Sequence, residues 1–136
     1  MSIRRLLVVS FAGALMMLPA CSGSGGVGVT LADYSVTPDA SSAPAGDVTF
    51  DITNDAEQTH EFVVFKTDLA ADQLPTNDDG DVDEKGEGVE HIDEIEDIAG
   101  GSNESLTVNL DAGNYVLICN LPGHYRQGMH ASFTVE

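Results

Sequence analysis

The stretch Cys119-Asn-Leu-Pro-Gly-His124-Tyr-Arg-Gln-Gly-Met129 places a thiol, an imidazole and a thioether at regular intervals in one short segment. These are the soft and borderline ligands that copper prefers, and one more histidine would complete a trigonal site of two histidines and a cysteine with a weak axial methionine. His60 can be that histidine. A loop of this length can bring three side chains to one ion, whereas the fourth ligand must come from another part of the fold.

The residues before this loop alternate in the manner of a β-strand. Tyr115, Leu117 and Cys119 share one face, so a core position for Leu117 also places Cys119 in the core, at the end of the strand. Tyr115 follows Gly113 near the strand start, where its hydroxyl could bond back to the preceding turn or its ring could simply be half-buried. Pro122 and Gly123 predict a turn that presents His124.

The same period of two recurs along the chain, and turn-forming residues separate the runs. Short strands without a long amphipathic helix predict an all-β fold, an antiparallel sandwich. The predicted strands lie around residues 48–52, 60–65, 106–110, 115–119 and 131–135.

An acidic insert over residues 68–104 interrupts this pattern and carries 14 of the 23 acidic residues. We expect a solvated loop, with one or two helical turns over residues 90–98, because apolar residues recur there every third position. Four of its acids match a calcium-binding loop, but Glu84 stands where that loop needs glycine, which disfavours calcium.

The first residues predict an export signal, since Arg4 and Arg5 precede an apolar run too short to span a membrane. Leu18-Pro19-Ala20-Cys21 resembles the bacterial lipoprotein box, in which the cysteine is lipidated and becomes the mature N-terminus. We therefore predict a signal peptide over 1–20, a lipidated Cys21 with a flexible tether over 21–26, and one domain over 27–136. The protein would be exported and lipid-anchored to the extracytoplasmic face of a bacterial membrane.

The charge and the cysteine count narrow the function further. The formal net charge is -18, and loss of Arg4 and Arg5 with the signal makes it -20. Nucleic acid and bare anionic lipid are therefore poor partners, while a cationic protein partner or simple solubility remains open. Once Cys21 is lipidated, Cys119 is the only thiol left, and it is either a metal ligand or a small buried side chain.

The segment Gly113-x-Tyr115-x3-Cys119-x4-His124-x4-Met129 resembles the ligand loop of the cupredoxin, or blue copper, family, and is most similar in spacing to sulfocyanin, rusticyanin and auracyanin. The resemblance implies a Greek-key β-sandwich, one type 1 copper ion and outer-sphere electron transfer. It also implies that His60 and His124 are equatorial ligands, Cys119 the thiolate and Met129 the weak axial ligand.

Two neighbouring positions bear on this resemblance. Many members have asparagine or serine after the first histidine, where it steadies the cysteine, whereas this chain has Glu61. His124 is expected to be the electron port, because it lies on the loop and its ring edge should approach solvent. Leu121, Pro122 and Tyr125 are expected to ring it.

The residues that flank Cys119 bear on the competing functions. A multicopper oxidase is disfavoured because Ile118 and Asn120 flank Cys119 where those enzymes have histidines, and we predict no enzymatic activity. We expect a monomeric electron carrier whose partners are redox proteins, such as a cationic cytochrome or an oxidase. The alternative is an extracytoplasmic copper carrier or buffer protein, although the open Met and His clusters typical of carriers do not occur in the sequence.

Overall fold

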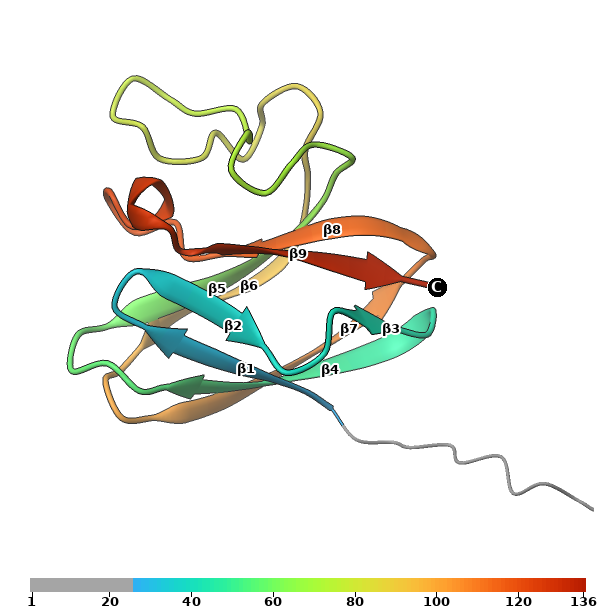
Figure 1. The fold of residues 1–136 in the computed structure, drawn as a ribbon, viewed down its shortest axis with the longest axis horizontal. Coiled ribbons are helices and arrows are strands. Elements are labelled where there is room, and N and C mark those ends of the chain that lie inside the picture. The colour runs from blue at the N-terminus through green and yellow to red at the C-terminus, as the bar shows by residue number, and fades with distance from the viewer. Residues whose placement is uncertain (1–25) are drawn as a thin grey trace, which may run out of the picture.

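Two β-sheets packed face to face make up residues 26–136, the part of the chain that the computed structural model describes (Figure 1). One sheet has the strand order β2-β1-β4-β7 and the other β3-β9-β8-β5-β6, which confirms the predicted all-β, cupredoxin-like sandwich. The predicted signal peptide and the lipidated Cys21 lie outside the described residues. The elements are β1 (Val27–Ala32), β2 (Ser35–Pro38), β3 (Ser42–Ala43), β4 (Gly46–Asn54), β5 (His60–Lys66), β6 (Glu90–Ile98), β7 (Asn103–Leu110), β8 (Gly113–Ile118), the 3-10 turn η1 (Tyr125–Gln127) and β9 (His130–Val135).

The main core lies between the sheets and is built from the alternating residues that the sequence marks. Phe50 on β4 is fully buried, and its ring centroid lies 5.3 Å from that of Phe62 and 5.4 Å from that of Phe133. Leu117 and Cys119 belong to the same cluster, as expected from the alternation along β8. The thiol therefore sits at the end of a core strand, inside the sandwich.

The prediction of a wholly antiparallel sandwich was wrong in two places. β1 runs parallel to β4, with Val27 opposite Phe50 and Leu31 opposite Asn54. The short β3 runs parallel to β9. Alternation of apolar residues reports which face of a strand is buried but says nothing about the direction of its neighbour.

The helical turns expected over residues 90–98 are also absent, because Glu90–Ile98 form β6, an edge strand paired with β5. Ile98 lies opposite His60 and Ile95 opposite Phe62, so three steps on β6 face two on β5. An extra residue of this kind is a β-bulge, which returns side chains three apart to the same face. The positive φ of Asp97, 55°, lies within that bulge.

The loop between β5 and β6, residues 67–89, covers the outer face of the second sheet, above β8 and β9 in Figure 1. We call it the covering loop. It closes a second apolar cluster, so β8 is buried on both faces rather than one. The buried members of that cluster are Val63, Phe65, Leu74, Val82, Val116, Ile118 and Tyr125.

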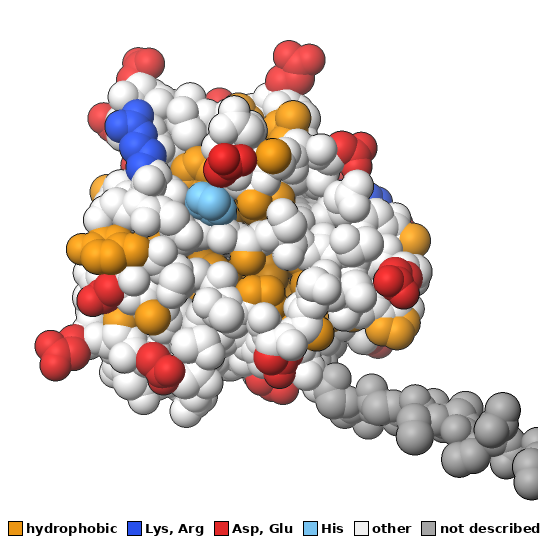
Figure 2. All heavy atoms as spheres, viewed as in Figure 1, with side chains coloured by type: hydrophobic (Ala, Val, Ile, Leu, Met, Phe, Trp, Pro, Cys, Tyr) orange, Lys and Arg blue, Asp and Glu red, His pale blue; other side chains and the backbone are white. Residues whose placement is uncertain are grey.

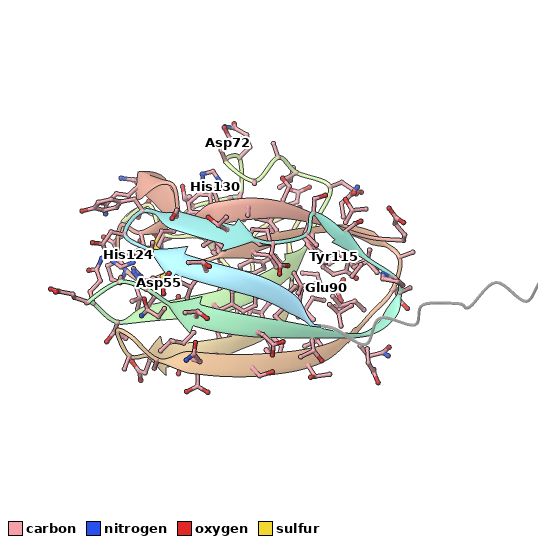
Figure 3. All side chains as sticks on the ribbon, turned by 60° about the horizontal axis from the view of Figure 1, so that its bottom comes forward. Asp55, Asp72, Glu90, Tyr115, His124 and His130 are labelled. Atoms are coloured by element: carbon pink, nitrogen blue, oxygen red, sulfur yellow. The ribbon has the colours of Figure 1, made fainter. Side chains whose placement is uncertain are left out.

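Tyr115 fixes the end of the sandwich that lies opposite His124 (Figure 3). Its hydroxyl donates a hydrogen bond to the carbonyl of Asp111 at 2.8 Å, in the turn before β8. The predicted bond back to the preceding turn is therefore present. It ties the β7–β8 connection at the end away from the cysteine.

Few of the negative charges of residues 26–136 are paired with a positive side chain. The ion pairs found there within 4.0 Å join Asp33 to His60 and Glu94 to His91, and none joins a carboxylate to lysine or arginine. Figure 2 shows acidic side chains spread over one face with few basic ones. None of the helical segments described is long and apolar enough to cross a membrane.

Candidate metal centre

The structure brings His60, Cys119 and His124 together, although 59 positions separate the first two. The Nδ1 atoms of the two histidines are 3.2 Å apart. Cys119 Sγ lies 3.7 Å from Nδ1 of His60 and 3.4 Å from Nδ1 of His124. A circle through these three atoms has a radius of about 2 Å, which is close to the bonding distances of a first-row metal ion to nitrogen and sulfur. The donor set and its size thus fit one trigonal metal ion.

Met129 is the fourth predicted ligand, and its backbone is hydrogen-bonded to those of Cys119 and His124. Its side chain is fully buried in the same cluster as Cys119. Its carbonyl accepts a hydrogen bond from the amide of Cys119 at 3.1 Å, and its amide donates to the carbonyl of His124 at 3.2 Å. The four residues form a His-Cys-His-Met cluster that fits one type 1 copper site.

The turn after Cys119 explains how His124 reaches the cluster. The amide of His124 donates to the carbonyl of Leu121 at 2.9 Å, and Gly123 has φ of 78°. Pro122 and Gly123 thus occupy the two central positions of a turn that needs a positive φ at the second, as the sequence predicts. Gly128, with φ of 112°, ends η1 and returns the chain to Met129.

His60 begins β5, and the turn before it is held by the buried Asn54. The side-chain amide of Asn54 donates to the carbonyl of Gln58 at 3.0 Å and to that of Ile98 at 2.9 Å. Its Oδ1 accepts from the amide of Ala56 at 3.0 Å. Two of these bonds lie within the β4–β5 turn and the third joins that turn to the end of β6, so together they fix where His60 enters the sandwich.

Sequence reasoning missed Asp33, which lies in the β1–β2 turn. Its Oδ1 is 3.8 Å from Nε2 of His60, a buried nitrogen with no hydrogen-bond partner among the described residues. Gln58 donates to the same oxygen at 2.7 Å and holds the carboxylate in place. At 3.8 Å the carboxylate makes no hydrogen bond to Nε2 of His60, so it acts on the imidazole through its charge. Only the fold reveals this contact, since no local pattern links residues 33 and 60.

Glu61 replaces the asparagine or serine common in the family, yet the cysteine still receives a hydrogen bond at this position. The backbone amide of Glu61 donates to Cys119 Sγ at 3.4 Å, and this bond does not depend on the side chain. Burial raises the pKa of the Glu61 carboxyl to about 7; the amide of Asn120 opposes this rise, and the nearby Glu94, Glu84 and Glu96 add to it.

The protonation states of the ligands follow from their burial. Burial raises the pKa of the Cys119 thiol, and the amide groups of Glu61 and Leu121 offset part of this rise. Burial and the nearby His124 lower the pKa of His60, with Asp33 acting in the opposite direction. At neutral pH the metal-free site therefore holds a neutral imidazole at His60 and a protonated thiol at Cys119.

This protonation pattern predicts that metal binding releases a proton. Since the bound sulfur is a thiolate, loading at pH 7 should release about one proton, and the apparent affinity should rise about tenfold per pH unit from pH 6.5 to 8. The redox-inert Zn²⁺ suits the measurement, by calorimetric titration in buffers of different ionisation enthalpy. An affinity independent of pH over this range would mean that the thiol is not a ligand.

A second group of possible ligands lies on the surface at β6 and the covering loop. Glu84, His91 and Glu94 offer donor atoms that all lie within 4.8 Å of one another. The side chains of His91 and Glu94 are 31% and 30% exposed and form an ion pair at 3.5 Å. Exposed acidic groups often cluster in this way without an ion, so we assign no metal to them.

Comparison with known proteins points to one family. A family model of the sulfocyanin (SoxE) domain matches residues 38–136, which is most of the chain. None of the curated proteins gives a significant match.

Solved structures show the same fold at low sequence identity. Reduced auracyanin from the photosynthetic bacterium Roseiflexus castenholzii is 20% identical with a TM-score of 0.57, and the match covers 82% of this chain and 99% of that one. Auracyanin A, a "blue" copper protein from Chloroflexus aurantiacus, is 22% identical with a TM-score of 0.54, covering 82% of this chain and 100% of that one. A multi-copper oxidase from Pediococcus acidilactici is 13% identical with a TM-score of 0.55, and the match covers 98% of this chain but only 30% of the oxidase.

The sulfocyanin match and the fold shared with the auracyanins agree with the cluster of two histidines, a cysteine and a methionine at one end of the sandwich. The chain belongs to the sulfocyanin domain family, within the cupredoxins.

Proposed function

We propose that this protein is a one-electron carrier that holds a single type 1 copper ion in the ligand set His60, Cys119, His124 and Met129. When bound, a type 1 copper ion supplies reversible exchange of one electron between its cupric and cuprous states. The observation that carries the proposal is the triangle of Nδ1, Nδ1 and Sγ atoms, whose sides of 3.2 to 3.7 Å suit one ion. The chain's own contribution is to keep that triangle unchanged in both states.

The frame around the ligands supports this role. His60 and Cys119 are fully buried. The strand that begins at His60, β5, and the strand that Cys119 follows, β8, are antiparallel and pair from Val63 opposite Ile118 to Lys66 opposite Tyr115. The hydrogen bond from the amide of Glu61 to Sγ restrains the sulfur. Ligands that cannot rearrange keep the barrier to electron exchange low. Phe62 and Leu117, both fully buried, keep water from the sulfur side of the site.

His124 is the proposed port for electrons. It is only partly buried, unlike His60, and lies at the end of the sandwich (Figure 3). Leu121 is partly exposed and Pro122 exposed beside it, so they offer an apolar rim. Tyr125 does not belong to this rim, contrary to the expectation from the sequence, because its side chain is 5% exposed and packs in the second cluster.

The partners that fit this surface are redox proteins with a cationic contact face. The chain's net charge without Arg4 and Arg5 is -20, and its carboxylates lack lysine or arginine partners throughout residues 26–136. Opposite charge accelerates encounter and weakens with salt. We further propose that Cys21 carries lipid and holds a monomeric domain at the extracytoplasmic face of a bacterial membrane, which mass spectrometry of the mature N-terminus would test.

The visible spectrum of the purified full-length protein after addition of cupric ion tests the proposed electron carrier. An intense blue thiolate-to-copper band with reversible one-electron voltammetry is the expected result. A colourless ion, or one that a mild chelator removes readily, would instead favour the alternative, a copper carrier or buffer protein. That outcome would overturn the electron-transfer role.

Replacement of Met129 by leucine tests the axial position. The variant should stay blue, since the three strong ligands remain, and its reduction potential should rise by about 60 mV or more, a tenfold shift for one electron. Leucine fills nearly the same buried volume, so the fold should be kept. Protein-film voltammetry of both proteins measures the difference. An unchanged potential would show that the thioether does not bind copper.

A further inference from the structure

We propose that the covering loop, residues 67–89, positions the His124 side of the metal site, and that Asp81 is its principal positioning residue. This inference deepens the proposed function and rests on it. The sequence gives the loop no role, since it reads as a solvated acidic segment. The structure joins it instead to three residues that lie between the ligands Cys119 and Met129.

The first contact is with Asn120, the residue after the cysteine. Asn120 Oδ1 accepts from the amide of Val82 at 2.7 Å, and its Nδ2 donates to the carbonyl of Val82 at 3.1 Å. The same Nδ2 lies 3.1 Å from Oε1 of Glu84. A side-chain amide that bonds both the N–H and the C=O of one residue reproduces the pair of hydrogen bonds between two residues of neighbouring β-strands. Asn120 is thereby attached to the covering loop.

The second contact lies on the N-terminal side of a histidine ligand. The amide of Gly123 donates to Oδ1 of Asp81 at 2.8 Å, and Gly123 immediately precedes His124. Hydrogen bonds to a carboxylate are shorter and stronger than those between neutral groups. The hydrogen bond from the amide of His124 to the carbonyl of Leu121 closes the turn in which Gly123 lies. The carboxylate thus fixes the Pro122–Gly123 peptide unit, directly before His124.

The third contact lies on the other side of His124. The hydroxyl of Tyr125 donates to the carbonyl of Ala71 at 2.8 Å and accepts from the amide of Leu74 at 3.0 Å. Tyr125 is also buried against Leu74 and Val82 in the second cluster. Residues before and after His124 are therefore both bonded to the covering loop.

The covering loop is itself held in shape near Asp81, as a positioning element must be. Oδ1 of Asn77 accepts from the amides of Asp79, Gly80 and Asp81 at 2.9 to 3.1 Å. The amide of Asn77 donates in turn to the carbonyl of Asp81 at 2.9 Å. Asp81 therefore projects from a closed turn, and its carboxylate is presented to Gly123 at little cost in conformational entropy.

Replacement of Asp81 by alanine, which removes the acceptor, tests this role. Loss of an outer-shell partner typically lowers metal affinity about ten- to a hundredfold, so we expect at least a tenfold loss in competition with a chelator. The copper hyperfine splitting of the oxidised protein should change as His124 loosens. Without metal, trypsin should cut after Arg126 several-fold faster, while cleavage after Lys66 stays constant.

Two further variants separate positioning from charge and from folding. Asp81→Asn keeps a carbonyl acceptor and should restore most of the affinity and the wild-type splitting. Asp79→Ala removes a carboxylate from the same turn, one that makes no hydrogen bond or ion pair within residues 26–136, and this variant should behave as wild type. If Asp81→Ala and Asp79→Ala behave alike in all three measurements, the inference is wrong. If the wild-type protein is not blue, the proposed function fails, while the trypsin comparison still decides the positioning role.

Discussion

Cys119→Ser is expected to remove the blue band completely, the largest single effect on the proposed function. The intense absorption requires a thiolate bound to copper, and the serine hydroxyl does not ionise in this pH range. The metal-loaded variant should also lose most of its metal-dependent stability. A ligand at a thousandfold excess over its dissociation constant stabilises the folded state by about 4 kcal/mol, and this term falls as binding weakens. Visible spectra and thermal unfolding with and without cupric ion measure both effects.

The metal-free serine variant provides one control, because it should unfold near the temperature of the metal-free wild type. His130→Ala provides the other. His130 lies just after Met129 and its ring packs 5.3 Å from that of Tyr125, yet it is not one of the clustered donors. This variant should remain blue. A blue serine variant would overturn the assignment of Cys119.

The sequence predicts the local parts of this site well. The face of Cys119 follows from the alternation with Tyr115 and Leu117, and the presentation of His124 follows from the proline and glycine before it. Both are short-range properties, set by strand period and turn chemistry. The meeting of His60 with this loop is long-range, and the spacing of residues implies it only through the resemblance to the cupredoxins.

Other features could not be predicted, for physical reasons that the structure makes clear. The three-residue spacing of Ile95 and Ile98 suits a helix in isolation, but a β-bulge between their pairs with Phe62 and His60 produces the same spacing in a strand. Edge strands show only a weak alternation of apolar and polar residues in the sequence, since much of their surface is exposed. The acidity of the covering loop likewise hides its few apolar residues, Leu74 and Val82 among them, which bury one face of β8.

The role of Asp33 shows the same limit at the metal site. Its carboxylate reaches Nε2 of His60 only because β1 pairs in parallel with β4 and brings the β1–β2 turn to the metal end. Neither the parallel pairing nor the contact has a sequence signature. Residues that act behind the ligands depend on the packing of distant strands, whereas the ligands themselves are found from residue type and spacing.

Phe50→Ala is expected to have the largest effect on stability, because Phe50 joins the two sheets below the metal site. Its ring contacts Phe62, two residues after His60, and Phe133 on β9, and it is fully buried. Truncating a buried phenylalanine to alanine costs about 3–5 kcal/mol, from lost burial and the cavity that remains. The free energy of unfolding of the metal-free protein should fall by this amount in urea, with little change in the m-value.

Thr49→Ala on the same strand is the matched control for this prediction. Thr49 points to the opposite face of β4, and its hydroxyl lies 2.8 Å from that of Thr107 in an exposed cross-strand pair. Losing such a pair should cost about 0.2–1 kcal/mol. Equal losses in the two variants would contradict the packing of Phe50 between the sheets. A loss confined to Phe50→Ala, partly recovered on copper loading, would show that the core and the metal site stabilise the same folded state.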